Sequence, residues 1–244
     1  MKVFHGFDQL PTFKDAVCSV GSYDGVHIGH KQLIERCVSL AREIGGESVI
    51  LTFEPHPRIV LGRGEGLKLL TTLPEKIERL RGEGVDNLVV IPFDEPFSKL
   101  KYSDFVKSYL IDKLSMRYMV IGYNHLFGHR NEGDFDHLTT LSHNLGFGVE
   151  MLPELRHDLA KVSSTVIRRL IESGDVESAT QQLDAPYLVL PSGNDINSLD
   201  PLKLLPPSGC YDAFVDGARQ PIEIAEGKII APSYYRKIEI LKPI

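Results

Sequence analysis

The sequence lacks several features that would each indicate a particular class of protein. Its 244 residues contain only three cysteines, Cys18, Cys37 and Cys210, which are well separated and form no CxxC pair. They indicate neither a disulfide framework nor a zinc site. No run of about 18 apolar residues is present, so no membrane-spanning segment is expected. The first residues, MKVFHGFDQLP, lack the long apolar core of a signal peptide. We therefore expect a cytoplasmic protein.

Charge and missing phosphate-binding signatures exclude further classes. The chain has 27 Lys and Arg against 33 Asp and Glu, a net charge of −6, with no basic run, so a non-specific nucleic-acid binder is not expected. The sequence has no GxGxxG after its first expected strand and no GxxxxGK[ST], which argues against a dinucleotide dehydrogenase and a P-loop enzyme. An acidic chain can still bind phosphate through backbone N–H groups and a few well-placed cations.

The first three quarters of the chain alternate between segments typical of strands and of helices. Strands are expected at 16–24, 47–55, 87–93, 116–124 and 146–153. Helices are expected at 28–45, 71–84, 103–115 and 134–145, and two short ones within 163–184, divided at Gly174. This alternation predicts an α/β fold with a parallel sheet. Ligands of such sheets bind at the carboxyl ends of the strands.

The composition changes near Pro186. The stretch PSGNDINSLDPLKLLPPSG is rich in Pro, Ser, Asn and Asp, and short alternating runs follow it. We expect a domain at 1–187 and a small C-terminal β element at 188–244. Such a small element is marginal alone, so we expect it to depend on the first domain.

The stretch GSYDGVHIGH (21–30) lies between an expected strand and an expected helix. A helix N-terminus presents unpaired N–H groups and a positive dipole. Gly25 and Gly29 allow a phosphate chain to approach the backbone, and His27 and His30 are suited to donate to its oxygens. The alternative is that Gly25 serves a turn and both histidines are surface residues. A metal site is less favoured, because no third ligand is evident nearby.

Two further stretches contain candidate binding residues. In TFEPHPRIVL (52–61), Pro55 and Pro57 fix the backbone around His56, which suits recognition of a flat ligand; alternatively, they only end the strand. The stretch SSTVIRRL (163–170) opens a helix. Its three hydroxyl residues are N-cap candidates, and the same helix end can bind phosphate. Arg168 opposes the helix dipole there, and an anionic ligand would explain its presence.

Four stretches together resemble the FMN adenylyltransferase module of bacterial bifunctional riboflavin kinase/FAD synthetases. They are GSYDGVHIGH (21–30), TFEPHP (52–57), IGYNHLFGHRNEGD (121–134) and VSSTVIRRLIESGDVESATQQLDAPY (162–187). The resemblance implies a Rossmann-like nucleotidyltransferase domain that transfers AMP from ATP to FMN, giving FAD and pyrophosphate. It implies Mg²⁺ with ATP as cofactor, ATP and FMN as small-molecule partners, and no protein-bound metal.

The resemblance also implies roles for individual residues. The implied catalytic residues are His27, His30, Asn124 and Arg168. The implied ATP and phosphate ligands are Gly21, Tyr23, Asp24, Gly25, Gly29, Ser163, Ser164 and Thr165. The implied flavin contacts are Pro55, His56, Pro57, Asn124 and Phe127.

The chain departs from the family pattern in two places. Leu126 stands where many relatives have a basic residue, although His125, His129 and Arg130 are near it in sequence. The stretch LDPLKLLPPSGCYDAFVDG (199–217) resembles part of the kinase barrel, but a GFPTAN-type segment is missing. We expect a truncated kinase-like tail without riboflavin kinase activity. Two alternatives stay open: a flavin- or nucleotide-binding protein with lost or reduced catalysis, and adenylyl or cytidylyl transfer to another phosphorylated acceptor. The sequence makes no prediction of oligomeric state.

Overall fold

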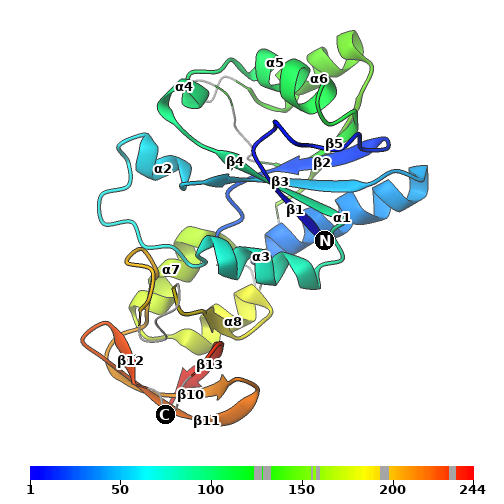
Figure 1. Cartoon of the computed structure of the whole chain (residues 1–244). Helices are drawn as coiled ribbons and strands as arrows, with labels where there is room; N and C mark the ends of the chain where they lie inside the picture. Colours follow the sequence, from blue (N-terminus) through cyan, green and yellow to red (C-terminus); the bar gives the residue numbers. More distant parts are fainter. Residues whose placement is uncertain (124–127, 129–132, 155, 158–159, 193–197, 231–234) are drawn as a thin grey trace. The chain divides into compact units, whose positions relative to one another are not determined.

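The computed structural model describes residues 1–123, 128, 133–154, 156–157, 160–192, 198–230 and 235–244. The chain forms two compact units, and each is built from segments that are separated in sequence (Figure 1). The first unit contains Met1–Ser22, His30–Gly66 and Leu80–Glu154, and the second contains Tyr23–Gly29, Leu67–Arg79 and Leu155–Ile244. The second unit extends across residue 187, where we expected a domain boundary. That boundary stays a prediction.

The first unit is organised around a six-stranded sheet with the strand order β1-β4-β3-β2-β5-β6. Its strands are β1 (Lys2–His5), β2 (Ala16–Val20), β3 (Ser48–Glu54), β4 (Asn87–Pro92), β5 (Met116–Gly122) and β6 (Gly148–Leu152). Every neighbouring pair is parallel, which confirms the expected α/β fold with a parallel sheet. The edge strand β1 was not expected, because its four residues are only partly buried and carry no strong apolar pattern.

Helices lie on both faces of this sheet. They are α1 (Ile28–Ile44), α2 (Pro57–Val60), α4 (Glu95–Ser98), α5 (Tyr102–Asp104), the π-helix η1 (Phe105–Ile111) and α6 (Phe135–Leu145). Figure 1 shows α1 on one face and α4, α5 and α6 on the other. The helix expected at 103–115 is divided into α5 and η1, which continue one another. None of the helices in the described ranges has the length and apolarity needed to cross a membrane.

The strand order places β2 between β3 and β5. The chain proceeds from β2 to β3 and β4 on one side and returns to β5 on the other, so β2 and β5 flank the topological switch point. In open α/β sheets, ligands bind beyond the carboxyl ends of the strands at this point. Gly21 follows β2 directly, and the segment after Gly122 follows β5.

The second unit contains a five-stranded antiparallel sheet with the order β12-β11-β10-β13-β9. Its strands are β9 (Tyr187–Val189), β10 (Gly209–Val215), β11 (Ala218–Ala225), β12 (Lys228–Ile230) and β13 (Ile238–Pro243). A separate short antiparallel pair consists of β7 (Arg156–His157) and β8 (Ala160–Lys161). The expected C-terminal β element is thereby confirmed.

Two helices share one core with this sheet. They are α7 (Ser164–Glu172) and α8 (Val176–Leu183), which are divided at Gly174 as expected. Ile167 and Leu183 from these helices belong to the same buried cluster as Ile238 of β13. The C-terminal strands therefore bury their apolar side chains together with helices that precede residue 187. The helix α3 (Leu73–Gly82) begins in the second unit and ends in the first.

Candidate functional site

The segment Tyr23–Val26 forms a tight turn in the second unit. Its residues Tyr23, Gly25 and Val26 have φ values of 48°, 87° and 45°, and Val26 N donates to Tyr23 O at 3.2 Å. A positive φ is rare for a β-branched residue such as valine. Residues held in such conformations cost on the order of 1–3 kcal/mol each and persist only where the surroundings enforce them. The contacts that enforce this turn are therefore of interest.

Asp24 connects this turn to two distant segments. Its carboxylate is buried, and Oδ1 accepts a hydrogen bond from Thr71 N at 2.9 Å. Thr71 reciprocates, because its Oγ1 accepts from Gly25 N at 2.9 Å. The other oxygen, Oδ2, accepts from Arg168 Nη2 at 2.7 Å. Asp24 is thus fixed on both sides, by a loop and by a helix.

Arg168 lies on α7, whose N-terminus is also tied to the turn. Ser163 Oγ caps this helix by accepting from Val166 N at 3.3 Å, which confirms its N-cap role. Ser164 Oγ donates to the backbone oxygen of Asp24 at 2.9 Å. Thr165 is exposed at the helix start. The phosphate-binding residues expected around 24 and 164 are therefore hydrogen-bonded to one another.

The position of Arg168 has a structural explanation that the sequence did not reveal. We expected an anionic ligand to explain a cation near a helix start, but the structure provides the Asp24 carboxylate as its partner. The guanidinium still retains donor capacity. Within the described ranges, the buried Arg168 Nε makes no hydrogen bond. An arginine has five N–H donors, which suit the oxygens of a phosphate.

His27 follows the turn and is only 7% exposed. Burial lowers the pKa of His27 to about 4, and the nearby Asp24 carboxylate offsets only part of this effect. The imidazole is therefore neutral at pH 7 and offers one donor and one acceptor. A Cβ at Gly29 would lie 3.3 Å from the His27 ring. Glycine at this position leaves room for the imidazole.

Gly25 is required by the turn itself. An added Cβ would lie 2.9 Å from Leu70 Cδ1 and 3.3 Å from Leu183 Cδ2, and the φ of 87° disfavours any side chain. Its N–H is engaged by Thr71, as described above. The turn role considered for Gly25 is thus present in the structure.

Gly21, His30 and the prolines after β3 lie in the first unit, at the carboxyl edge of the parallel sheet. Gly21 N donates to Leu51 O at 3.0 Å, and Thr52 Oγ1 donates to Ser22 O at 3.1 Å. His30 is partly buried on α1. One backbone hydrogen bond and one from a side-chain hydroxyl thus join the chain after β2 to β3 at this edge.

The prolines after β3 form a rigid corner. Strand β3 ends at Glu54, Pro55 is exposed, and Pro57 is the first residue of α2. His56 caps this short helix, because its Nδ1 accepts from Arg58 N at 3.2 Å. Asn124 and Phe127, the other expected flavin contacts, lie outside the described residues, as do His125, Leu126, His129 and Arg130.

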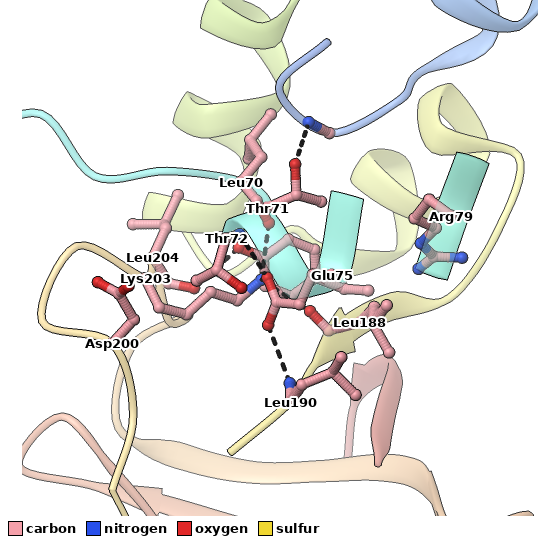
Figure 2. Close-up of polar contacts among 12 residues, drawn as sticks. Leu70, Thr71, Thr72, Glu75, Arg79, Leu188, Leu190, Asp200, Lys203 and Leu204 are labelled. Carbon is pink, nitrogen blue, oxygen red and sulfur yellow. Dashed lines mark hydrogen bonds and ion pairs between the residues drawn. The ribbon is translucent and has the colours of Figure 1, made fainter. Parts of the chain in front are cut away.

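Sequence reasoning missed Thr71, which binds Asp24 and Gly25. It also missed the buried ion pair between Glu75 and Lys203, shown in Figure 2. The stretch TTLPEK (71–76) is interpreted from the sequence only as a helix start, and Lys203 only as part of the stretch 199–217 that resembles the kinase barrel. A lysine preceded and followed by leucines offers a weak signal of burial. Its partner is 128 residues away, so the pairing cannot be read from the sequence.

No protein-bound metal site is evident in the described parts of the chain. They contain no group of three or more His, Cys, Asp and Glu side chains that could hold a metal ion. Both carboxylate oxygens of Asp24 already accept hydrogen bonds.

Comparison with solved structures supports the architecture. A crystal structure described as a macrolide-efflux protein from Streptococcus pneumoniae superimposes with a TM-score of 0.83 at 21% identity, covering 100% of this chain and 91% of that chain. This likeness shows the fold alone.

Comparison with known sequences identifies the family. Bifunctional riboflavin kinase/FMN adenylyltransferases from Listeria monocytogenes and Bacillus subtilis are 36% and 34% identical over 70% and 71% of this chain, which spans 54% and 55% of their length. A putative enzyme of the same description from Geobacillus thermodenitrificans is 35% identical over 76% of this chain and 98% of its own length. The FAD synthetase family model matches residues 10–166. Because this match covers more than half of the sequence, the chain belongs to the FAD synthetase family.

Proposed function

We propose that this protein transfers AMP from ATP to FMN. An oxygen of the FMN phosphate attacks the α-phosphorus of ATP and forms the new P–O bond. The bond between the α-phosphorus and the oxygen bridging to the β-phosphorus breaks, and pyrophosphate leaves with the electron pair. FAD is the other product. No protein nucleophile is needed, so catalysis consists of positioning and charge stabilisation.

The observation that supports this proposal is the hydrogen-bonded cluster of Asp24, Ser164 and Arg168 inside a chain of this family. The family resemblance assigns these residues to ATP. Their mutual hydrogen bonds fix them before any ligand binds, and preorganised donors stabilise developing charge without reorganisation. Arg168 would donate its remaining N–H groups to phosphate oxygens, and His27 would donate as a neutral imidazole.

We assign the flavin side to Pro55, His56 and Pro57 and to Asn124 and Phe127, and we assign His30 to the reacting phosphates. The corner at 55–57 is rigid, because Pro57 begins a helix that His56 caps. A rigid surface loses little conformational entropy when a flat ligand binds. Mg²⁺ would enter with ATP, held by the phosphates, since Mg²⁺ sites commonly use substrate phosphates with few protein ligands.

We further propose that the tail beyond residue 187 does not phosphorylate riboflavin. It offers no GFPTAN-like segment and no glycine-rich phosphate loop. Its buried side chains, such as Ala213, Ile222 and Ile240, belong to a packed core instead. We assign the reaction to the cytoplasm, where the free thiols of Cys18, Cys37 and Cys210 suit a reducing environment.

The direct test is to incubate purified protein with ATP, Mg²⁺ and FMN and to separate the flavins by chromatography. Time-dependent FAD that requires both substrates supports the proposal. Tight binding of FMN or ATP without FAD would instead indicate a binding protein. Consumption of ATP only with a different phosphorylated acceptor would indicate another transferase.

A further inference from the structure

Lys203 is a fully buried cation in the tail. Its ammonium group donates to Leu70 O at 2.6 Å, Leu188 O at 2.7 Å and Glu75 Oε2 at 2.8 Å (Figure 2). An ammonium has three donors, and each of them has an acceptor here. The Nζ atom also lies 4.2 Å from the centre of the Tyr187 ring, a distance at which a cation and an aromatic face attract one another.

Glu75, the counterion, is 0% exposed and is itself fully engaged. Its Oε2 accepts from Thr72 N at 2.8 Å, and its Oε1 accepts from Leu190 N at 2.9 Å. Burying two charges is costly unless the geometry satisfies both. If only packing mattered here, two apolar side chains of similar volume could replace Lys203 and Glu75. The polar pair instead specifies where the backbone at Leu70 and Thr72 must lie.

The loop at residues 69–72 is therefore held by the tail from two directions. The ammonium of Lys203 binds the carbonyl of Leu70. In addition, Leu69 N donates to Leu202 O at 2.7 Å, and Leu204 N donates to Leu69 O at 2.9 Å. The residues on both sides of Lys203 thus form a parallel bridge with the loop.

The same loop carries the contacts that fix the strained turn. Thr71, which follows Leu70, binds Asp24 through its backbone N and Gly25 through its Oγ1. Asp24 in turn binds Arg168. A continuous chain of hydrogen bonds and covalent neighbours leads from Lys203 through Leu70 and Thr71 to the Asp24 carboxylate and the Arg168 guanidinium.

We infer that Lys203 is a positioning residue for the phosphate-binding cluster, acting through Thr71 on Asp24 and Arg168. It lies outside the residues 10–166 that match the family model and within the tail. The tail therefore has a task in adenylyl transfer: it holds the loop that sets the orientation of Arg168. The effect that we expect on the kinetics of ATP rests on the proposed function. The effect that we expect on the pKa of His27 rests on the structure alone.

The test compares Lys203→Met with Lys228→Met, a control at an exposed lysine on β12 of the same tail. Misplacing a binding group by about 1 Å can cost 10²-fold, so we expect KM for Mg-ATP to rise about tenfold or more in Lys203→Met. In Lys203→Met, the KM for FMN should stay within about twofold of wild type. In Lys228→Met, the KM values for both substrates should stay within about twofold of wild type. A role in global stability alone would lower the active fraction and hence kcat, but it would leave KM for ATP unchanged.

A second measurement follows the His27 imidazole by NMR and needs no turnover. The pKa of His27 is about 4 because burial lowers it by more than the nearby Asp24 carboxylate raises it. We expect Lys203→Met to move it toward 6.5, because the turn is no longer held, and Lys228→Met to leave it in place. A folded Lys203→Met protein with unchanged KM for ATP and unchanged His27 titration would overturn the inference. If wild type forms no FAD, the proposed function fails, while the His27 titration still decides the role of Lys203.

Removing Lys203 leaves the Glu75 charge buried without its counterion, which destabilises the fold. A second variant therefore tests the same path with the ion pair in place. Thr71→Val is the second variant, since it removes the hydroxyl that accepts from Gly25 N and leaves the ion pair intact. Thr71→Ser is its matched control, because it keeps the hydroxyl. We expect the valine variant to reproduce both changes and the serine variant to show neither. Wild-type values for Thr71→Val would contradict the proposed path through Thr71.

Discussion

The carboxylate of Asp24 and the guanidinium of Arg168 are joined by a hydrogen bond of 2.7 Å between Oδ2 and Nη2, although 144 residues separate them in sequence. Both side chains are largely buried, at 1% and 9% exposure. The pair fastens α7 to the turn that precedes His27. The hydrogen bond thereby connects two stretches, 21–30 and 162–187, that the family resemblance assigns to ATP.

The geometry of this pair predicts that Arg168→Lys is not a conservative change. A planar guanidinium can bind Asp24 and still present further donors to a phosphate, whereas an ammonium acts as a point charge. We expect kcat/KM for ATP to fall at least about tenfold, a loss of roughly 1.4 kcal/mol. Arg169→Lys is the control, because the neighbouring Arg169 is exposed. Wild-type ATP saturation and turnover in Arg168→Lys would remove Arg168 from the site.

His30→Ala should slow FAD formation far more than it weakens FMN binding. A donor aimed at developing phosphate charge acts in the transition state, and its removal typically costs about 10²–10³ in rate. Steady-state kinetics and flavin fluorescence titration measure the two quantities separately. His143→Ala, at an exposed histidine on α6, should leave both unchanged. An unaltered kcat in His30→Ala would refute the catalytic role.

Stability should depend on pH through His27. The folded protein holds the pKa of His27 at about 4, below the usual value of 6.5, because the imidazole is buried. Between pH 6.5 and 4 the unfolded chain therefore binds a proton that the folded protein excludes. The free energy of unfolding contributed by this group is present above pH 6.5 and decreases as the pH falls toward 4, by on the order of 3 kcal/mol.

The measurement is urea denaturation of wild type and His27→Gln at several pH values. Because the other titrating groups are common to both proteins, the difference between the two curves isolates His27. We expect the free energy of unfolding of wild type to fall relative to that of His27→Gln as the pH falls toward 4. Parallel curves over this range would show that His27 titrates normally.

Gly25→Ala should destabilise the protein more than Gly217→Ala. The two glycines have nearly equal φ values of 87° and 86°, so the conformational penalty is matched. A Cβ at Gly217 would meet no atom within 4 Å, whereas one at Gly25 would lie 2.9 Å from Leu70 Cδ1. We expect about 1–2 kcal/mol for Gly217→Ala and about 1–3 kcal/mol more for Gly25→Ala. Equal denaturation midpoints would show that the turn tolerates a side chain.

The tail should not convert riboflavin to FMN. A kinase must hold the γ-phosphate, the metal and the riboflavin hydroxyl in one geometry, and residues 188–244 lack the segments expected for that task. The assay supplies riboflavin, ATP and Mg²⁺ to protein free of host kinase. Production of FMN or FAD above the background would show that the tail is an active kinase.

The parallel sheet and the two helices after residue 163 could be predicted because their signals are local. Strands such as Ser48–Glu54 are short and mostly apolar, and Gly174 divides α7 from α8 as its position indicates. The strand β9 was not predicted: Tyr187–Val189 has only three residues, and its partner β13 is about 50 residues further along the chain. Pairing between segments so far apart in the chain produces no periodic pattern in the sequence.

Structural roles of single residues at the candidate site could be predicted, but the hydrogen bonds that connect these residues could not. The turn glycine and the Ser163 cap follow from rules about single positions. The partners of Asp24 do not, because Thr71 and Arg168 come from segments 47 and 144 residues away. The same holds for the Lys203–Glu75 pair, in which two charged residues that usually face solvent are buried together.

Labelled ATP distinguishes transfer of the α-phosphorus of ATP to FMN from transfer of the terminal phosphate. Purified protein is incubated with FMN, Mg²⁺ and either [α-³²P]ATP or [γ-³²P]ATP, and flavins are separated from phosphates. We predict that the α label appears in FAD and the γ label in pyrophosphate, in equal amounts and at a rate that Arg168→Lys reduces. The γ label in any flavin, or no α label in FAD from folded wild-type protein that saturates with both substrates, would show that the protein does not transfer AMP to FMN.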